Sequence, residues 1–325
     1  MNSDNKFTQF DVISQLRFPM IVLVTYAHSY GRVADDFFLL SSDWNLYEFL
    51  KLLISQVLVK VAVPVFYIIS GYLFFLHLER WKWSVWRQKM LRRGMTLLAP
   101  YLIWNLLMAF KLQNYNWYIF LEPANMPLWF LRDLIVVSIL SPVIYWCIRR
   151  LGVWLLVALA VFYFTGMRET TPGLSMYSFF YFTIGAFLSL RGMDLLATMR
   201  RYEIPAYVFS LLLAVSMLLT YHSEAFHHLM LAFRLAGAIS AFCLASRMMV
   251  LTDYRIPKTV CDASYFIYLA HYAFFFSFID NAFFSFFGTS EMSLSVHYLL
   301  SPLLKVMLFV AVYTLYRRLK TVFFP

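Results

Sequence analysis

Two ionisable residues, Arg17 and His28, stand at the ends of the apolar segment RFPMIVLVTYAH, residues 17–28. Eleven steps along an α-helix, at about 100° and 1.5 Å each, return to nearly the same face about 16 Å further on. The two side chains are therefore predicted to share one helical face. A neutral imidazole can take a proton from an attacking hydroxyl, and an arginine can stabilise the resulting oxyanion. For the histidine alone, packing against a backbone carbonyl is an equally good interpretation.

The chain around this segment is strongly apolar. Of its 325 residues 62% are hydrophobic and only 14% are charged, and the mean hydropathy is +0.68. A helix that spans a bilayer needs roughly 20 mostly apolar residues. Stretches of this kind are centred near residues 20, 64, 103, 138, 159, 182, 212, 238, 274 and 306. We expect an all-α polytopic membrane protein with about ten spans, forming a single domain over residues 1–325.

The net charge of +10 follows the predicted topology. Most of the Lys and Arg residues fall in alternate loops, and six of them lie within residues 80–93. Because basic loops stay in the cytoplasm, both termini are predicted to be cytoplasmic, and no nucleic-acid partner is needed to explain the charge. The first apolar stretch lacks a basic leader and a cleavage site, so it is expected to remain as a helix. The three cysteines lack metal-ligand spacing, and we expect no metal.

Several ionisable residues remain inside the predicted spans, where they are costly and usually functional. They are Arg17, His28, Lys60, Arg132, Asp133, Arg234, His271, Asp280 and Lys305. Cations outnumber carboxylates, which indicates an anion or water in the interior. For Lys60 and Lys305, snorkelling or lining a hydrated crevice is an equally good interpretation.

Five further segments are arranged in an order that is typical of one family. They are VPVFYIISGYLFF (63–75), LLAPYLIWN (97–105), LWFLRDLIVVSILSP (128–142), YFTIGAFLS (181–189) and SYFIYLAH (264–271). Together with the Arg17/His28 spacing, the chain resembles the acyltransferase-3 family of integral membrane acyltransferases. Members often carry two arginines three residues apart before a Pro-Tyr pair, but here Arg93 is followed by Thr96. The esterase-like domain that some members append is not expected.

The resemblance implies transfer of an acyl group, commonly acetyl, from cytoplasmic acyl-coenzyme A to a hydroxyl of a glycan or lipid-linked saccharide of the cell envelope. It places the chain in the inner (plasma) membrane, with acyl-coenzyme A as a co-substrate and no permanently bound cofactor. The basic segment 80–93 suits the phosphates of coenzyme A, although orientation and anionic lipids explain it equally well. The residues expected to contact acyl-coenzyme A are Arg93, Arg92, Lys89, Ser70, Gly71 and His271.

The same resemblance assigns the reacting groups. His28 is the expected general base, and Asp133 either orients its ring or neutralises a nearby arginine. Arg17, Arg132 or Arg234 is expected to stabilise the oxyanion or the leaving thiolate, and the sequence leaves that choice open. Trp129 is expected at the depth of His28. A continuous passage is expected to join the basic cytoplasmic mouth to His28.

Three further features each allow two interpretations. Gly71 either admits the pantetheine arm or allows tight helix packing, and packing is slightly favoured. His271 is placed in the inner half, as a ligand of coenzyme A or a structural residue. The segment YHSEAFHH (221–228) is better explained as a solvated loop than as a metal site. For the whole chain, a transporter or flippase for an anionic solute, or a non-catalytic scaffold, are the competing interpretations.

Overall fold

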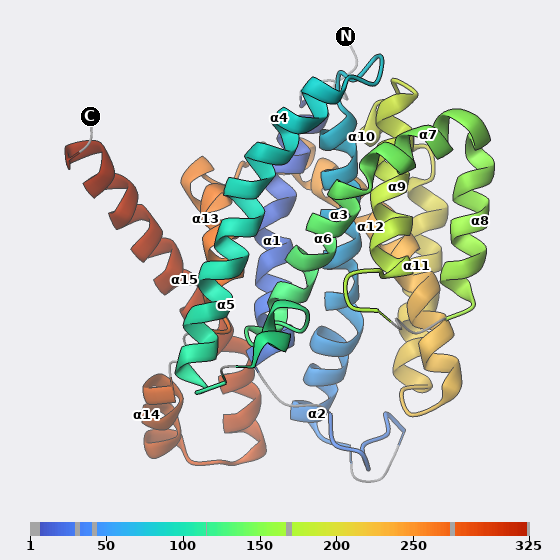
Figure 1. The fold of residues 1–325 in the computed structure, drawn as a ribbon. Helices are drawn as coiled ribbons and strands as arrows, with labels where there is room; N and C mark the ends of the chain where they lie inside the picture. The colour runs from blue at the N-terminus through green and yellow to red at the C-terminus, as the bar shows by residue number, and fades with distance from the viewer. Residues whose placement is uncertain are drawn as a thin grey trace.

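The computed structural model describes residues 7–29, 33–40, 44–114, 116–166, 171–273 and 277–323, and all regular elements in these ranges are helices (Figure 1). The predicted all-α class is confirmed. Four helices are long and apolar enough to cross a bilayer: Gln9–Ser29, Leu46–Phe75, Glu224–Thr252 and Glu291–Thr321. A bent pair, Met126–Ile139 and Ser141–Leu151, makes a fifth if it counts as one span. The chain therefore crosses the membrane several times, and the count of ten spans stays a prediction.

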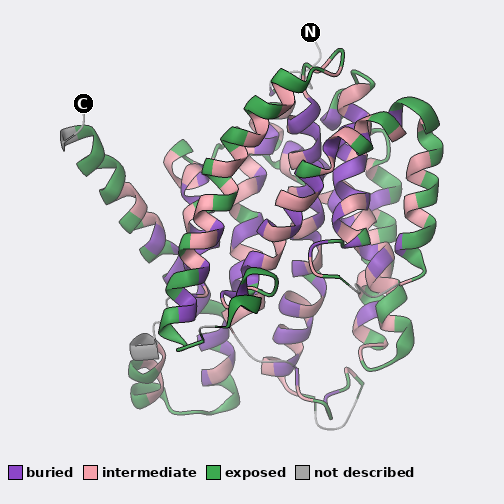
Figure 2. Cartoon of the chain, in the orientation of Figure 1, coloured by how far each residue is buried: buried purple, intermediate pink, exposed green. Residues whose placement is uncertain are grey.

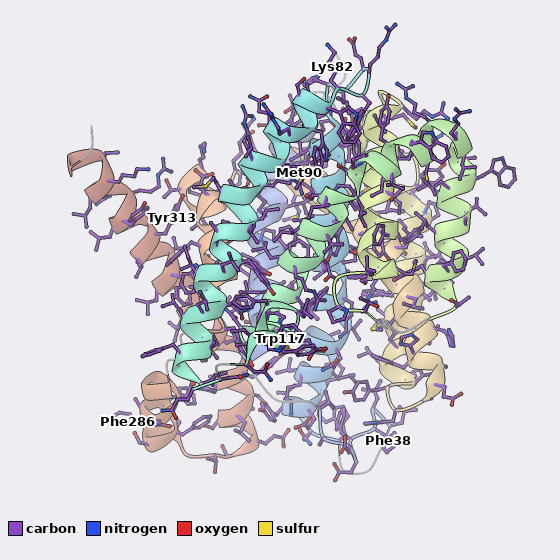
Figure 3. All side chains as sticks on the ribbon, viewed as in Figure 1. Phe38, Lys82, Met90, Trp117, Phe286 and Tyr313 are labelled. Carbon is purple, nitrogen blue, oxygen red and sulfur yellow. The ribbon has the colours of Figure 1, made fainter. Side chains whose placement is uncertain are left out.

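The helices run side by side as a bundle. Helices α1 (Gln9–Ser29), α3 (Ala62–Phe75) and α6 (Trp129–Ile139) stand in its middle, and the start of α1 lies at the same end of the molecule as the last residues of α15 (Glu291–Phe323) (Figure 1). Lys82 lies at that end, whereas Phe38 and Phe286 lie at the opposite one (Figure 3). This common end of α1 and α15 agrees with the predicted topology, but which side of the membrane it faces stays a prediction.

The remaining helices complete the bundle around these three. They are α2 (Leu46–Leu50), η2 (Lys51–Val57), η3 (Leu58–Val61), α4 (Trp83–Arg93), η4 (Gly94–Leu98), α5 (Ala99–Lys111), η5 (Trp117–Phe120), η6 (Met126–Leu128), α7 (Ser141–Leu151), α8 (Val153–Phe164), α9 (Met176–Leu190), α10 (Leu195–Arg200), α11 (Glu203–Leu219), α12 (Glu224–Thr252), α13 (Lys258–Ala270), α14 (Ser277–Phe287) and α15 (Glu291–Phe323). The basic segment 80–93, predicted as a loop, is therefore largely helical.

Apolar side chains cover the outside of the bundle as well as its core. Trp154 on α8 and Ile204 and Leu211 on α11 are exposed, whereas buried residues concentrate on central helices such as α1 and α3 (Figure 2). A soluble protein would not present such continuous apolar helical surfaces to water. Lipid is their natural solvent.

Helices α3 and α9 pack with their backbones in contact through two glycines. A Cβ on Gly71 would lie 2.0 Å from the carbonyl oxygen of Phe182, and a Cβ on Gly185 would lie 2.0 Å from that of Ile68. Small residues allow this approach, and in lipid such packing is a main source of helix association. Gly71 therefore faces α9, and its geometry fits the packing interpretation rather than contact with a pantetheine arm.

The centre of the ninth predicted span, near residue 274, lies outside the described residues. The structure describes a helix on either side of it, α13 (Lys258–Ala270) and α14 (Ser277–Phe287), and the span itself stays a prediction. Helix α13 begins after its N-cap residue Pro257 and ends at Ala270. His271 consequently lies at the end of α13, away from the inner half where the sequence analysis placed it.

Candidate active site

Helix α1 places Arg17 and His28 in the walls of two neighbouring cavities. The His28 cavity, of about 190 Å³, is lined by Val24, Ala27, His28, Val59, Lys60, Val63, Phe66, Pro127, Trp129, Phe130, Tyr177, Arg234 and Tyr268. The Arg17 cavity, of about 300 Å³, is lined by Arg17, Ile21, Phe66, Ile69, Ser70, Leu73, Leu97, Phe130, Leu131, Leu134, Ser264, Tyr265 and Tyr268. The shared helical face predicted for Arg17 and His28 thus opens into two spaces.

Three aromatic residues, Phe66, Phe130 and Tyr268, line both cavities and form a partition between them. The ring centroid of Phe130 lies 6.0 Å from that of Phe66 and 5.8 Å from that of Tyr268. The Tyr268 hydroxyl donates to the carbonyl oxygen of Pro127 at 2.7 Å, which fixes this side of the partition. The two cavities therefore adjoin at these three aromatic side chains, and a continuous passage between them stays a prediction.

His28 lies beside a second histidine. Its ring centroid is 5.4 Å from that of His271 and 5.9 Å from that of Tyr272. The Nδ1 atom of His271 is 2.9 Å from the carbonyl oxygen of Tyr268 and 3.1 Å from that of Ile267. Since carbonyl oxygens only accept, this nitrogen carries the proton and Nε2 keeps its lone pair. Among the described residues, Nε2 of this buried ring has no hydrogen-bond partner.

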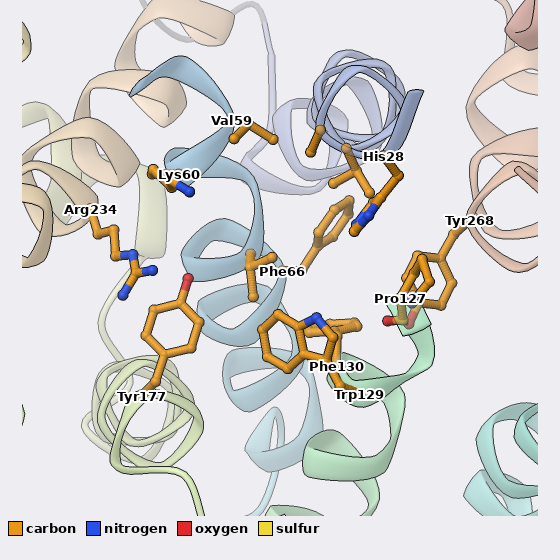
Figure 4. A pocket seen from close by; sticks show the side chains of 13 residues that line it. His28, Val59, Lys60, Phe66, Pro127, Trp129, Phe130, Tyr177, Arg234 and Tyr268 are labelled. Carbon is orange, nitrogen blue, oxygen red and sulfur yellow. The ribbon is translucent and has the colours of Figure 1, made fainter. Parts of the chain in front are cut away.

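Two cations face the His28 cavity from its far side. Figure 4 shows the Lys60 ammonium and the Arg234 guanidinium pointing to the side where Tyr177 stands, across from His28. The guanidinium carbon of Arg234 lies 4.6 Å from the Tyr177 ring centroid, and Lys60 Nζ donates to Gln56 Oε1 at 3.4 Å. These contacts are with neutral groups.

The backbone around Lys60 is irregular. A π-helical turn, Lys51–Val57, and a 3₁₀ turn, Leu58–Val61, precede Pro64 on the same continuous helix. Proline has no N–H group and clashes with the carbonyl four residues earlier, which here belongs to Lys60. Pro64 is the sequence feature that accompanies this irregular backbone.

Asp133 and Arg132 form an ion pair with each other. The Asp133 Oδ1 atom lies 2.7 Å from Nη2 and 2.8 Å from Nε of Arg132, and Arg132 Nη1 donates to the carbonyl oxygen of Leu121 at 2.7 Å. Neither residue lines either cavity, whereas Trp129 lines the His28 cavity. Shared depth does not bring neighbouring helical residues to one face, because each is rotated by about 100° from the last. The neutralising role foreseen for Asp133 fits this geometry better than the orienting one.

The other carboxylate expected inside the membrane, Asp280, is also engaged. Its Oδ1 accepts from His297 Nε2 at 3.0 Å and from Ser301 at 2.9 Å, and its Oδ2 lies 3.4 Å from Lys305 Nζ. Lys305 is thus paired rather than snorkelling. With both carboxylates engaged elsewhere, the predicted intramembrane cations that line the cavities are Arg17, Lys60 and Arg234.

Arg93 and Lys89 approach the Arg17 cavity from α4. Arg93 donates to the hydroxyl groups of Ser70, at 3.1 Å, and Ser138, and its guanidinium lies over the Phe74 ring at 4.7 Å. Lys89 donates to the carbonyl oxygen of Phe74. The adjacent Arg92 is exposed. The structure thus brings together Arg17, Ser70 and Arg93 and leaves Arg92 at the surface.

The histidine-rich segment forms no metal site in the described ranges, where no group of three or more His, Cys, Asp or Glu side chains is placed to hold an ion. The His222 Nε2 atom lies 3.0 Å from the carbonyl oxygen of Phe37. His227 and His228 are exposed near the start of α12. The segment is therefore largely exposed, as predicted, but residues 224–228 form the start of α12 rather than a loop.

Comparison with known protein families shows the family to which the chain belongs. A family model described as an acyltransferase domain, that of acyltransferase 3, matches residues 11–316, nearly the whole chain. The chain belongs to the acyltransferase 3 family. Comparisons with curated proteins and with solved structures gave no match. The predicted family is confirmed, and this acyltransferase 3 protein is a membrane acyltransferase that uses an acyl donor.

Several cavity residues of this acyltransferase were not selected from the sequence. Phe66, Tyr177 and Tyr268 were not assigned to the site, and Lys60 was noted only as a buried cation. An aromatic residue is common in every apolar helix, so the sequence alone does not separate those that line a cavity from those that face lipid. The partner of His28 was also misjudged, because the position of His271 depends on where α13 begins.

Proposed function

We propose that this protein is an O-acyltransferase that moves a short acyl group, most simply acetyl, from acyl-coenzyme A to a hydroxyl of a cell-envelope saccharide. The observation that carries the proposal is the arrangement of Arg17 and His28 on one helix, in adjoining cavities that share an aromatic partition. The donor arm occupies the Arg17 cavity from the end that bears α4. The acceptor occupies the His28 cavity.

The reaction proceeds at the partition between the cavities. The acceptor hydroxyl oxygen attacks the thioester carbonyl carbon while the neutral His28 imidazole takes the hydroxyl proton. The tetrahedral intermediate collapses, the carbon–sulfur bond breaks, and the thiolate of coenzyme A leaves with the proton held by His28. Arg17, in the donor cavity, stabilises the negative charge on the departing sulfur.

His271 acts as a positioning residue in this scheme. Its Nδ1–H group donates to the carbonyl oxygens of Ile267 and Tyr268, so Nε2 is left as an acceptor next to the His28 ring. An acceptor here can fix which nitrogen of His28 carries its proton and which faces the hydroxyl. This is the role that the sequence analysis considered for Asp133.

The direct test uses purified protein with radiolabelled acetyl-coenzyme A and an envelope glycan extract. We expect release of free thiol and label in the glycan, and loss of both in His28→Ala protein that keeps its elution volume and unfolding temperature. Uptake of an anionic solute into proteoliposomes without any thiol release would support the transporter interpretation instead. The cytoplasmic termini and the location in the inner membrane belong to this proposal and are testable with reporter fusions.

A further inference from the structure

Lys60 and Arg234 bring two positive charges to one side of the His28 cavity. Among the ion pairs of the described residues, neither has a carboxylate partner. The Nε atom of Arg234 is buried and has no hydrogen-bond partner among the described residues. Its neighbours are the ring of Tyr177 and the hydroxyl of Tyr163.

Two cations in a low-dielectric cavity repel each other, and each has lost much of its hydration. The two carboxylates predicted inside the membrane are engaged elsewhere. Asp133 pairs with Arg132, and Asp280 contacts His297, Ser301 and Lys305. A compensating negative charge must therefore come from water-borne ions or from a ligand. An anion that bridges an ammonium and a guanidinium makes strong charge-assisted hydrogen bonds.

The position of the pair selects which ligand supplies this charge. Lys60 and Arg234 line the His28 cavity and not the Arg17 cavity, so they lie beyond the aromatic partition from the donor arm. The phosphates of coenzyme A remain on the α4 side in the proposed reaction. The anion must then belong to the molecule that shares the cavity with His28.

We infer that Lys60 and Arg234 form an anion subsite for the acceptor, whose acylated hydroxyl lies near a carboxylate or phosphate group of the same molecule. The inference rests on the proposed function and names its acceptor class as acidic saccharides. The anion at Lys60 and Arg234 anchors the sugar, and His28 on the opposite wall meets the hydroxyl (Figure 4). Trp129 and Tyr177 provide flat apolar faces between the two ends.

Matched acceptors test the subsite. Methyl β-glucuronide and methyl β-glucoside differ only in a carboxylate against a hydroxymethyl group, and methyl glucoside 6-phosphate carries a phosphate at the same position. With acetyl-coenzyme A as donor, we expect kcat/KM for at least one acidic sugar to exceed that for the glucoside by about tenfold or more, the scale of one charge-assisted hydrogen bond. The preferred acid identifies the carboxylate or the phosphate as the bound group.

Variants separate anchoring from catalysis. Lys60→Met should raise KM for the preferred acidic sugar about tenfold more than KM for the glucoside, because only the acidic sugar loses a charged partner. Lys60→Arg keeps the charge and should retain most of the preference. Arg150→Met, at an exposed cation on α7, should behave as the parent protein. Equal kcat/KM for acidic and neutral sugars in the parent protein overturns the inference, as does an equal fall of kcat for both in Lys60→Met, which indicates oxyanion stabilisation.

A binding measurement keeps the inference separate from the proposed function. The same three sugars are titrated into the protein, and the shift of its unfolding temperature is recorded without donor. Stabilisation by an acidic sugar but not by the glucoside, lost in Lys60→Met, supports the subsite. If the same protein releases no thiol from acetyl-coenzyme A, the transfer reaction is rejected and the subsite is retained. Absence of any charge-dependent stabilisation in a protein that does transfer acetyl rejects the subsite alone.

Discussion

The rings of His28 and His271 lie with their centroids 5.4 Å apart, although they belong to the first helix and to the end of α13. Hydrogen bonds to two backbone carbonyl oxygens fix the proton of His271 on Nδ1. The Nε2 atom of His271 can therefore only accept a hydrogen bond, and it lies next to the His28 imidazole that is proposed as the base. The proposed roles of the two histidines can therefore be distinguished by mutating each of them alone.

Replacement of His28 by alanine removes the proposed base. We expect kcat for acetyl transfer to fall by about 10²- to 10⁴-fold, the usual contribution of general-base catalysis, with little change in the KM for acetyl-coenzyme A. Thiol release measured with a chromogenic disulfide reports the rate. His228→Ala, at an exposed histidine, is the matched control and should retain full activity. A His28→Ala protein that transfers acetyl at the parent rate excludes His28 as the base.

His271 is expected to act through His28 rather than on the substrate. His271→Phe should lower kcat on the order of tenfold, since it removes the acceptor nitrogen proposed to orient the His28 ring during the reaction, and it should leave KM for the donor unchanged. His271→Gln offers a side-chain oxygen as an acceptor and should recover part of the loss. A rise in the donor KM instead would return His271 to the coenzyme A site predicted from the sequence.

Arg93 and Arg92 provide a matched pair in the donor region. Arg93 is bonded to Ser70, which lines the Arg17 cavity, whereas Arg92 is exposed. Arg93→Ala is expected to raise KM for acetyl-coenzyme A by about tenfold or more through loss of a charge-assisted contact, and Arg92→Ala should change it little. Acetyl-pantetheine lacks the nucleotide phosphates. If Arg93→Ala raises the KM for acetyl-pantetheine as much as the KM for acetyl-coenzyme A, Arg93 supports the cavity wall and does not bind phosphate.

The aromatic partition predicts a limit on donor size. Phe66→Ala removes one side chain between the cavities and should increase the rate with butyryl-coenzyme A relative to acetyl-coenzyme A by about tenfold, because a lost phenyl ring leaves room for the added methylenes. Competition between the two donors in one reaction gives the ratio directly. Phe110→Ala, at an exposed position on α5, is the control. An unchanged ratio in Phe66→Ala indicates that the acyl group does not pass this residue.

Gly71 tests the packing of α3 on α9. In Gly71→Ala a methyl group would lie 2.0 Å from a backbone carbonyl oxygen, so the helices must separate, and we expect a loss of about 2 kcal/mol or more in the free energy of unfolding. Gly94→Ala meets no atom within 4 Å and should be neutral or slightly stabilising. Thermal unfolding in detergent compares the two. Equal stability of both variants contradicts the close contact of α3 with α9.

The sequence by itself determined the class of this protein and its first functional helix. Apolar stretches of roughly 20 residues indicate a helical membrane protein, because a helix of that length spans the bilayer and satisfies its own backbone groups. The shared face of Arg17 and His28 also follows from the sequence, since helical periodicity is a local property. The family was also predicted from segments of the sequence, and the family comparison confirms it over residues 11–316.

Only the tertiary structure decided which residues meet. The rotation and depth of each helix depend on contacts between helices, such as the glycine-mediated packing of α3 on α9, and these involve residues far apart in the chain. For this reason Asp133 was considered near His28 but pairs with Arg132, while His271 was placed near coenzyme A but lies beside His28. The division of the interior by Phe66, Phe130 and Tyr268 has the same origin, because three separate helices bring these rings together.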